Sequence, residues 1–214
     1  MFKILKGQQE YQEGIVICNE SKNASSLPFT LHFLGAAVET NKKVCLISSQ
    51  FTEMNYKLIC SKAGVRWNPA NISFFEVIQP GYSFDKEVRQ IMDDVYERIV
   101  DAKPEFVIFD DLSALESFGA TDVEISLFIH KVYGFLASVH EIPLVFAPFS
   151  SSPQVTSLLK PYTNLHIELN PIGHGFAKDA ASKAILTLRD FTTSTKKAML
   201  ISGERTNNGQ WVSI

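Results

Sequence analysis

Short, continuous runs of apolar residues alternate with helical patterns through the first 150 positions of this 214-residue chain. Each run is four to seven residues long and shows no polar–apolar alternation, which is typical of a strand buried on both faces. Strands of this kind, separated by helices, predict a mostly parallel sheet flanked by helices, an α/β fold. The five runs lie at about 14–18, 43–48, 72–78, 105–111 and 142–147.

Start and stop signals support the helices expected between these runs. Pro28 falls in the first turn of one helix, where a missing N–H costs nothing, and Gly64 follows the last turn of the next. Thr121 and Glu124 have the spacing of a capping box. The helical patterns cover about 26–38, 53–63, 84–99 and 121–139.

The last third of the chain has a different pattern. Residues 164–169 alternate with period two, residues 183–189 and 196–202 follow as strands, and Asn207-Asn208-Gly209 is a hairpin-turn signal before Trp211. No helix is expected between these segments. We therefore predict an antiparallel meander at the sheet's edge and a single domain over residues 1–214.

Composition narrows the class of protein. No window approaches the roughly 20 consecutive apolar residues of a membrane span, and the N-terminus lacks a signal-peptide core, so we expect the cytoplasm or the nucleus and no membrane partner. The net charge of −3 argues against strong sequence-independent nucleic-acid binding. Cys18, Cys45 and Cys60 form no CxxC pair, and we expect buried structural thiols.

The loop after the first strand is where a nucleotide-binding α/β domain would carry GxxxxGK[ST], whose backbone N–H groups surround the phosphates. Here the stretch reads Asn19-Glu20-Ser21-Lys22-Asn23-Ala24-Ser25-Ser26, and no glycine lies between Gly14 and Gly35. Glu20 adds a carboxylate, and Lys22 lies too early to end such a loop. We therefore expect no nucleotide hydrolysis by this chain alone, hence no catalytic residues and not an enzyme.

Asp110 and Asp111 follow the apolar run Phe106–Phe109, which has the form of a Walker B strand whose carboxylate helps to hold Mg²⁺. The alternative is that Asp110 or Asp111 caps the short segment 112–118. Without a phosphate-binding loop we favour the cap. Glu76 could mimic a catalytic base, but an exposed strand-end carboxylate is the simpler interpretation.

The histidines predict no metal, cofactor or catalytic site. His130 falls on the helical stripe Val123-Leu127-His130-Gly134, which favours a packed, hydrogen-bonded histidine, and His140 lies at a helix C-terminus, where positive charge is favourable. His166 and Glu168 share one strand face, with no further ligand converging in sequence. The loop 173–175, Gly-His-Gly, is non-specific.

Three groups of segments, in order along the chain, resemble the family of the sixth subunit of the Elongator complex. The most specific group is Phe109-Asp110-Asp111-Leu112-Ser113-Ala114-Leu115 with Gly119 and 128–130. The others are His32-Phe33-Leu34 with 43–45 and 62–65, and Gly175-Phe176-Ala177-Lys178-Asp179.

This resemblance implies a RecA-like fold that lacks a functional phosphate-binding loop. It also implies assembly with two sister subunits, Elongator proteins four and five, into a heterohexameric ring that serves the core Elongator subunits. That ring binds tRNA and supports wobble-uridine modification. The family supplies no agreed catalytic residues, so none is assigned.

A charge asymmetry offers a surface for tRNA. Residues 1–150 hold 13 Lys and Arg against 19 Asp and Glu, whereas residues 151–214 hold seven against four. A mixed solvated surface would also account for this difference. Two other functions stay open: an active RecA/KaiC-like ATPase with a divergent nucleotide site, and a recombination-accessory paralogue that binds single-stranded DNA. The candidate tRNA contacts are Lys178, Lys183, Arg189, Lys196, Lys197 and Arg205.

Overall fold

The computed structural model describes residues 13–21, 24–78, 86–150, 152–171, 182–189, 194–201 and 209–212. Only the backbone is described for 182–183, 188–189, 194–201 and 209–212. The described strands form one sheet with the order β3-β2-β4-β5-β1-β6-β7-β8-β9. Their bounds are β1 Gly14–Glu20, β2 Val44–Ser48, β3 Ile72–Glu76, β4 Phe106–Phe109, β5 Leu144–Ser150, β6 Thr163–Pro171, β7 Ser182–Arg189, β8 Ser194–Ile201 and β9 Gly209–Val212.

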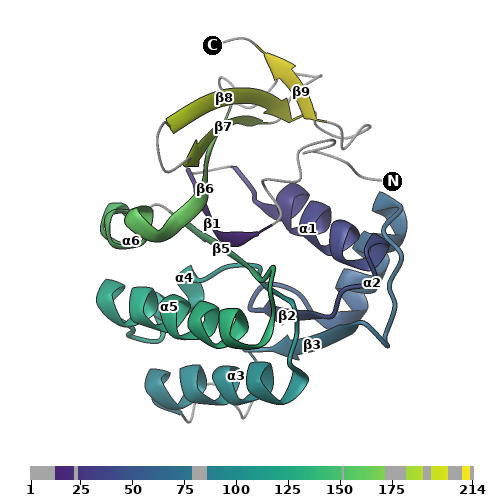
Figure 1. Cartoon of the computed structure of the whole chain (residues 1–214), viewed down its shortest axis with the longest axis vertical. Helices are drawn as coiled ribbons and strands as arrows, with labels where there is room; N and C mark the ends of the chain where they lie inside the picture. The colour runs from purple at the N-terminus through teal and green to yellow at the C-terminus, as the bar shows by residue number, and fades with distance from the viewer. Residues whose placement is uncertain are drawn as a thin grey trace.

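Helices follow the first five strands (Figure 1). The pattern in the sequence therefore gave the correct fold class: a mostly parallel sheet between helical layers, with antiparallel edge strands. The helices are α1 Leu27–Glu39, α2 Glu53–Ala63, α3 Val88–Ala102, α4 Ser113–Ser117, α5 Asp122–Val139 and α6 Pro153–Leu159, the last continuing as the 3₁₀ turn Lys160–Tyr162.

Two hydrophobic cores lie on opposite faces of the sheet. Val16 and Cys18 of β1 belong to the core under α1 and α2, and Ile15 and Ile17 belong to the core under α3, α5 and α6. Successive side chains of a strand point to opposite faces, so a strand without polar residues is required wherever both faces are covered. This is why the continuous apolar runs identified the central strands.

Pairing differs from the sequence-based prediction at one strand. β6 pairs in parallel with β1, and only β7, β8 and β9 continue antiparallel. The parallel pairing is possible because α6 intervenes between β5 and β6, and the sequence reasoning missed this helix. Its signal was present: Ser152 caps it by accepting a hydrogen bond from the Val155 N–H, and Pro153 opens it.

The expected helix signals are confirmed. The Thr121–Glu124 capping box is formed at the start of α5, and Gly64 ends α2 with a left-handed φ of 73°. His140 lies at the C-terminal end of α5, with its Nε2 3.2 Å from the carbonyl oxygen of Lys103. The start of the third predicted helix, near residue 84, and the hairpin turn at 207–208 lie outside the described residues.

Cys18, Cys45 and Cys60 are buried free thiols, as expected. Burial raises the pKa of Cys45 to about 12 and that of Cys60 to about 11, so both stay protonated and unreactive at neutral pH. No helix within the described residues has the length and apolar character needed to cross a membrane.

Candidate functional site

The carboxyl ends of β1, β2 and β4 lie at the same edge of the sheet, where open parallel sheets usually bind their ligands. Three carboxylates lie along this edge: Glu20 at the end of β1, and Asp110 and Asp111 after β4. The charges of Asp111 and Asp110 both act on Glu20. We call these three residues the carboxylate edge.

Glu20 occupies the position where a phosphate-binding loop would place an anion. Its Oε1 accepts a hydrogen bond of 2.5 Å from the backbone N–H of Ser26, the residue immediately before α1. Backbone N–H groups at a helix N-terminus are the donors that such loops offer to phosphates. The loop is also tied to β6, because the Ser21 hydroxyl donates to the Leu169 carbonyl over 2.7 Å. Lys22 and Asn23 lie outside the described residues.

The electrostatics of this edge disfavour a further anion. Burial raises the pKa of Glu20, its hydrogen bonds from Ser26 oppose that effect, and the negative charges of Asp111 and Asp110 raise the pKa again. The contribution of Asp111 and Asp110, as distinct from the larger effect of burial, reports a negative local potential. A triphosphate entering here would have to displace the Glu20 carboxylate from the Ser26 N–H.

Asp110 is buried, with 4% of its surface exposed, and both of its carboxylate oxygens are fully engaged. Its partners all belong to β2 and the segment that follows it. Oδ2 accepts from the Ser48 hydroxyl at 2.5 Å, the Gln50 N–H at 3.2 Å and the Tyr56 hydroxyl at 3.3 Å. Oδ1 accepts from the Ser49 N–H at 2.7 Å and the Ser49 hydroxyl at 3.0 Å.

These contacts revise the expectation for Asp110. It does not cap the segment after β4, because its carboxylate holds the β2–α2 connection. Burial raises its pKa, and the hydrogen bonds from Ser48, Ser49 and Gln50 oppose that effect. With five donors on two oxygens, binding of a metal ion would require breaking several of these bonds.

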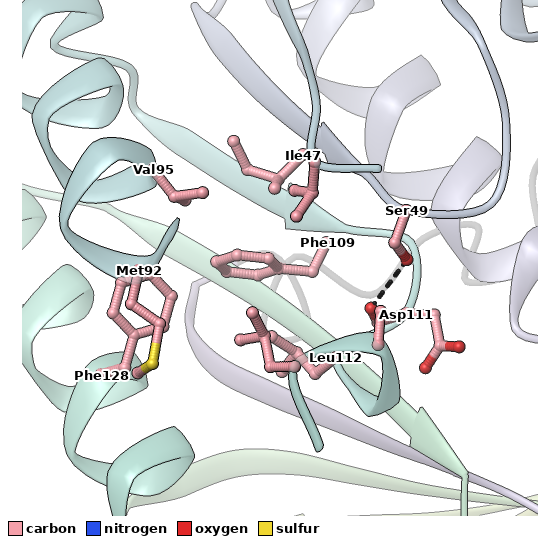
Figure 2. Close-up of a pocket in the computed structure, with 11 residues that line it drawn as sticks. Ile47, Ser49, Met92, Val95, Phe109, Asp111, Leu112 and Phe128 are labelled. Atoms are coloured by element: carbon pink, nitrogen blue, oxygen red, sulfur yellow. Dashed lines mark hydrogen bonds between the residues drawn. The ribbon is translucent and has the colours of Figure 1, made fainter. Parts of the chain in front are cut away.

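Asp111 supplies the predicted cap. Its Oδ1 accepts a 2.8 Å hydrogen bond from the Ser113 N–H at the start of α4, and its backbone carbonyl accepts one from the Ser49 hydroxyl at 3.0 Å. Figure 2 shows Ser49 and Asp111 at the mouth of a pocket whose other labelled residues are apolar.

The pocket beneath them is a small void. It has a volume of about 10 Å³ and lies between the sheet residues Ile47 and Phe109, the helix residues Val95 and Phe128, and Leu112 before α4 (Figure 2). A void of that size holds about one water molecule. It is far too small for a nucleotide, so its residues are best understood as core packing.

A second polar cluster joins β1, β6 and α6, and the sequence reasoning missed it. The Asn19 amide group lies 2.8 Å from the Thr156 hydroxyl and 3.2 Å from Nε2 of His166, while Nδ1 of His166 lies 3.6 Å from the Glu168 carboxylate. Burial lowers the pKa of His166. The sequence placed His166 and Glu168 on one face, but only the parallel β1–β6 pairing brings Asn19 to them.

The remaining predicted positions have varied surroundings. His130 is half-buried and packs edge-on against Tyr162, with ring centroids 4.3 Å apart; burial lowers its pKa. Glu76 is half-buried rather than exposed. Within the described part of the chain, no three His, Cys, Asp or Glu residues gather as a metal site would require.

The structure leaves the candidate tRNA contacts untested. Strand pairing sets position 196 opposite position 187, and position 197 opposite position 186. Adjacent strand positions belong to opposite faces of a sheet, so the candidates on β7 and β8 do not all share one face. Lys183, Arg189, Lys196 and Lys197 are described by backbone alone, and Lys178 and Arg205 lie outside the described residues.

Comparisons with known proteins bear on the fold. No protein-family model matches the sequence, and no curated protein matches it. The flagellar accessory protein FlaH from Methanocaldococcus jannaschii matches with a TM-score of 0.64 and 13% identity, over 95% of this chain and 90% of that one. A KaiC-like protein from Pyrococcus horikoshii matches with a TM-score of 0.63 and 11% identity, over 94% and 89%.

The fold is RecA-like. The two structural matches extend over nearly the whole of this chain, including the parallel sheet and its antiparallel edge. Identities of 13% and 11% establish a shared fold and nothing finer. What this RecA-like chain does must therefore be argued from its own site.

Proposed function

We propose that this chain is a non-catalytic subunit of the Elongator accessory ring, in which it assembles with Elongator proteins four and five as a heterohexamer. In that role it supports tRNA binding and wobble-uridine modification together with the core Elongator subunits. The proposal combines the sequence resemblance with a RecA-like fold whose nucleotide edge is occupied by the chain's own side chains.

The observation that carries the non-catalytic part is the hydrogen bond from the Ser26 N–H to Glu20. A phosphate-binding loop must leave such donors free for the nucleotide. Here the donor before α1 is used internally, and the carboxylate that uses it repels phosphate. The second half of a nucleotide site is used in the same way, because Asp110 is bound to Ser48, Ser49, Gln50 and Tyr56.

Co-expression tests the assembly. The chain would be produced with the two sister subunits, one of them tagged, and the purified complex weighed by native mass spectrometry. We expect a stable complex of six chains containing all three subunits. Purification of the sister subunits as a pair, with this chain left behind, would refute the proposed assembly whatever the state of its nucleotide edge.

Calorimetric titration with ATP and Mg²⁺ separates this proposal from an ATPase with a divergent site. We expect no heat of binding for the isolated chain. The Glu20→Gln variant removes the negative charge and keeps a side-chain oxygen that can accept from Ser26. Tight Mg²⁺-dependent binding of ATP by the folded wild type would favour the ATPase.

Competition between nucleic acids tests the third function. A labelled tRNA bound to the assembled complex would be challenged with unlabelled tRNA or single-stranded DNA at a stated salt concentration, because phosphate contacts depend strongly on salt. We expect tRNA to compete better. A preference for single-stranded DNA would instead support a recombination-accessory role.

A further inference from the structure

Helix α5 is apolar on two opposite faces, although only one of them is covered. Its inner face packs on the sheet through Ile125, Ile129, Val132 and Leu136, which are at most 1% exposed. The sequence stripe at positions 123, 127, 130 and 134, on which His130 was expected to be a packed histidine, lies on the opposite, outer face. A helix that is apolar all round is usually covered all round, so the outer face requires an explanation.

The outer face is linked to the segment after α6 by the ring contact between His130 and Tyr162, and exposed apolar side chains lie on both elements. Val123 is 49% exposed and Leu127 is 63% exposed, and on the α6 side Leu158 is 39% and Tyr162 61% exposed. Figure 1 shows α5 between α3 and α6, and none of the described helices or strands is drawn over it in this view. We call this surface the outer patch; it consists of Val123, Leu127, His130, Gly134 and Ala137 of α5 together with Leu158 and Tyr162.

The size of the outer patch is that of an interface core. The exposed fractions of Val123, Leu127, Leu158 and Tyr162 amount to about 400 Å² of residue surface, a size that is usual for the largest apolar patch on a monomer, and such patches are often functional. A specific interface takes about 800 Å² from each partner, and its rim is polar. Gln154 and Ser157 of α6 are exposed beside the patch and can supply part of that rim.

The charge pattern favours a protein partner over a nucleic acid. All seven patch positions lack an acidic, lysine or arginine side chain, and depletion of charge at the centre marks protein–protein interfaces. Lys131, at the α3 side of the stripe, is already engaged: its Nζ lies 3.5 Å from Asp93 and 4.0 Å from the ring centroid of Tyr96. A surface for phosphates would need free cations.

The order of large and small residues along the stripe favours a second copy of the same chain. The N-terminal half carries Val123 and Leu127, and the C-terminal half carries Gly134 and Ala137. If two α5 helices pack antiparallel, the large residues of each face the small residues of the other. A two-fold contact requires this self-complementarity. Gly134 has open space where a Cβ would lie, which lets a partner side chain approach the helix closely.

We propose that the outer patch is a homodimer interface in which α5 packs antiparallel against α5 of a second copy. Leu127 of one copy lies over Gly134 of the other, and the two His130–Tyr162 ring pairs flank the two-fold axis. This contact goes beyond the proposed ring, and it uses the outer side of α5 rather than the carboxylate edge.

Cysteine cross-linking tests the arrangement. His130 lies near the proposed two-fold axis, so His130→Cys should form a disulfide-linked dimer under mild oxidation at low protein concentration. Met54→Cys is the matched control, because Met54 is 82% exposed on α2, beneath the other face of the sheet. The native thiols are buried and should not compete. Equal cross-linking of both variants would overturn the proposal.

Sedimentation equilibrium gives the second measurement. We expect the wild-type chain to dimerise and Leu127→Asp to raise the dimer dissociation constant about 100-fold or more, because each dimer would bury two unpaired carboxylates. Met54→Asp should leave the constant unchanged, and circular dichroism would verify that both variants are folded. A wild-type chain that stays monomeric across the concentration range, or binds only a different protein through this patch, would overturn the homodimer. Neither outcome affects co-purification with the sister subunits, which tests the proposed function.

Discussion

Asp110 gives the sharpest test of whether the end of β4 is a structural or a nucleotide-binding feature. Replacement by alanine removes the acceptor for two fixed backbone donors, the N–H groups of Ser49 and Gln50, and for the buried Tyr56 hydroxyl. The Ser48 hydroxyl retains a second partner, the Phe51 carbonyl at 2.6 Å. Each buried donor left unpaired costs about 1–3 kcal/mol. Because Ser49 and Gln50 are not fully buried, water can reach their N–H groups in part, and we expect Asp110→Ala to lower the free energy of unfolding by about 3–5 kcal/mol, the lower part of that sum.

Urea denaturation followed by circular dichroism measures this loss. For a chain of this size the dependence on urea is about 3 kcal/mol per molar, so the midpoint should fall by about 1 to 1.7 M. Asp111→Ala is the matched control, since it removes one helix-cap bond, to the Ser113 N–H, and should cost about 1 kcal/mol. If Asp110→Ala unfolds at the wild-type midpoint, or is less affected than Asp111→Ala, the structural role is refuted.

The pH dependence of stability gives an independent measurement on the same residue. Burial raises the pKa of Asp110 above its ordinary value of 3.8, so the folded state binds a proton more tightly than the unfolded state. By linkage, the contribution of Asp110 protonation to the free energy of unfolding is largest below pH 3.8, and it is lost as pH rises through the pKa of Asp110 in the folded state. Asp110→Asn should remove that part of the slope. If the difference in the free energy of unfolding between the wild type and Asp110→Asn does not change with pH in this window, the raised pKa of Asp110 is contradicted.

Two further predictions concern other parts of the fold. Gly14 has a φ of +80°, and a Cβ there would lie 2.3 Å from the Asn164 side chain. Gly14→Ala should therefore lower the thermal midpoint and cost about 2 kcal/mol or more of stability. In α1 a Cβ on Gly35 would make only ordinary contact, at 3.6 Å from Val65, so Gly35→Ala should be neutral or stabilising by up to about 1 kcal/mol. Burial lowers the pKa of His166 below its ordinary 6.5, so its contribution to stability is complete above pH 6.5 and is lost as pH falls through the folded pKa. His166→Asn should flatten the loss of urea stability between neutral and mildly acidic pH, and an unchanged slope would contradict this.

The sequence by itself determined the layered architecture. Runs such as Val44–Ser48 and Phe106–Phe109 contain no polar face, and a strand with two apolar faces is stable only when helices cover both. Local signals also set several helix ends, because the Thr121–Glu124 box and Gly64 act through bonds within a few residues. The loop without glycine, with a carboxylate at Glu20, was likewise visible in the sequence.

Only the tertiary structure decided what the polar residues contact. Asp110 was a cap or a metal ligand by pattern, but its partners come from β2, about 60 positions earlier in the chain. Asn19 meets His166 only because β6 pairs in parallel with β1. The stripe at Val123 and Leu127 could not be assigned to the core or the surface, because α5 is apolar on both faces. The periodicity of a helix shows which residues share a face. Which element covers that face depends on contacts between residues distant in sequence, and a local pattern does not contain them.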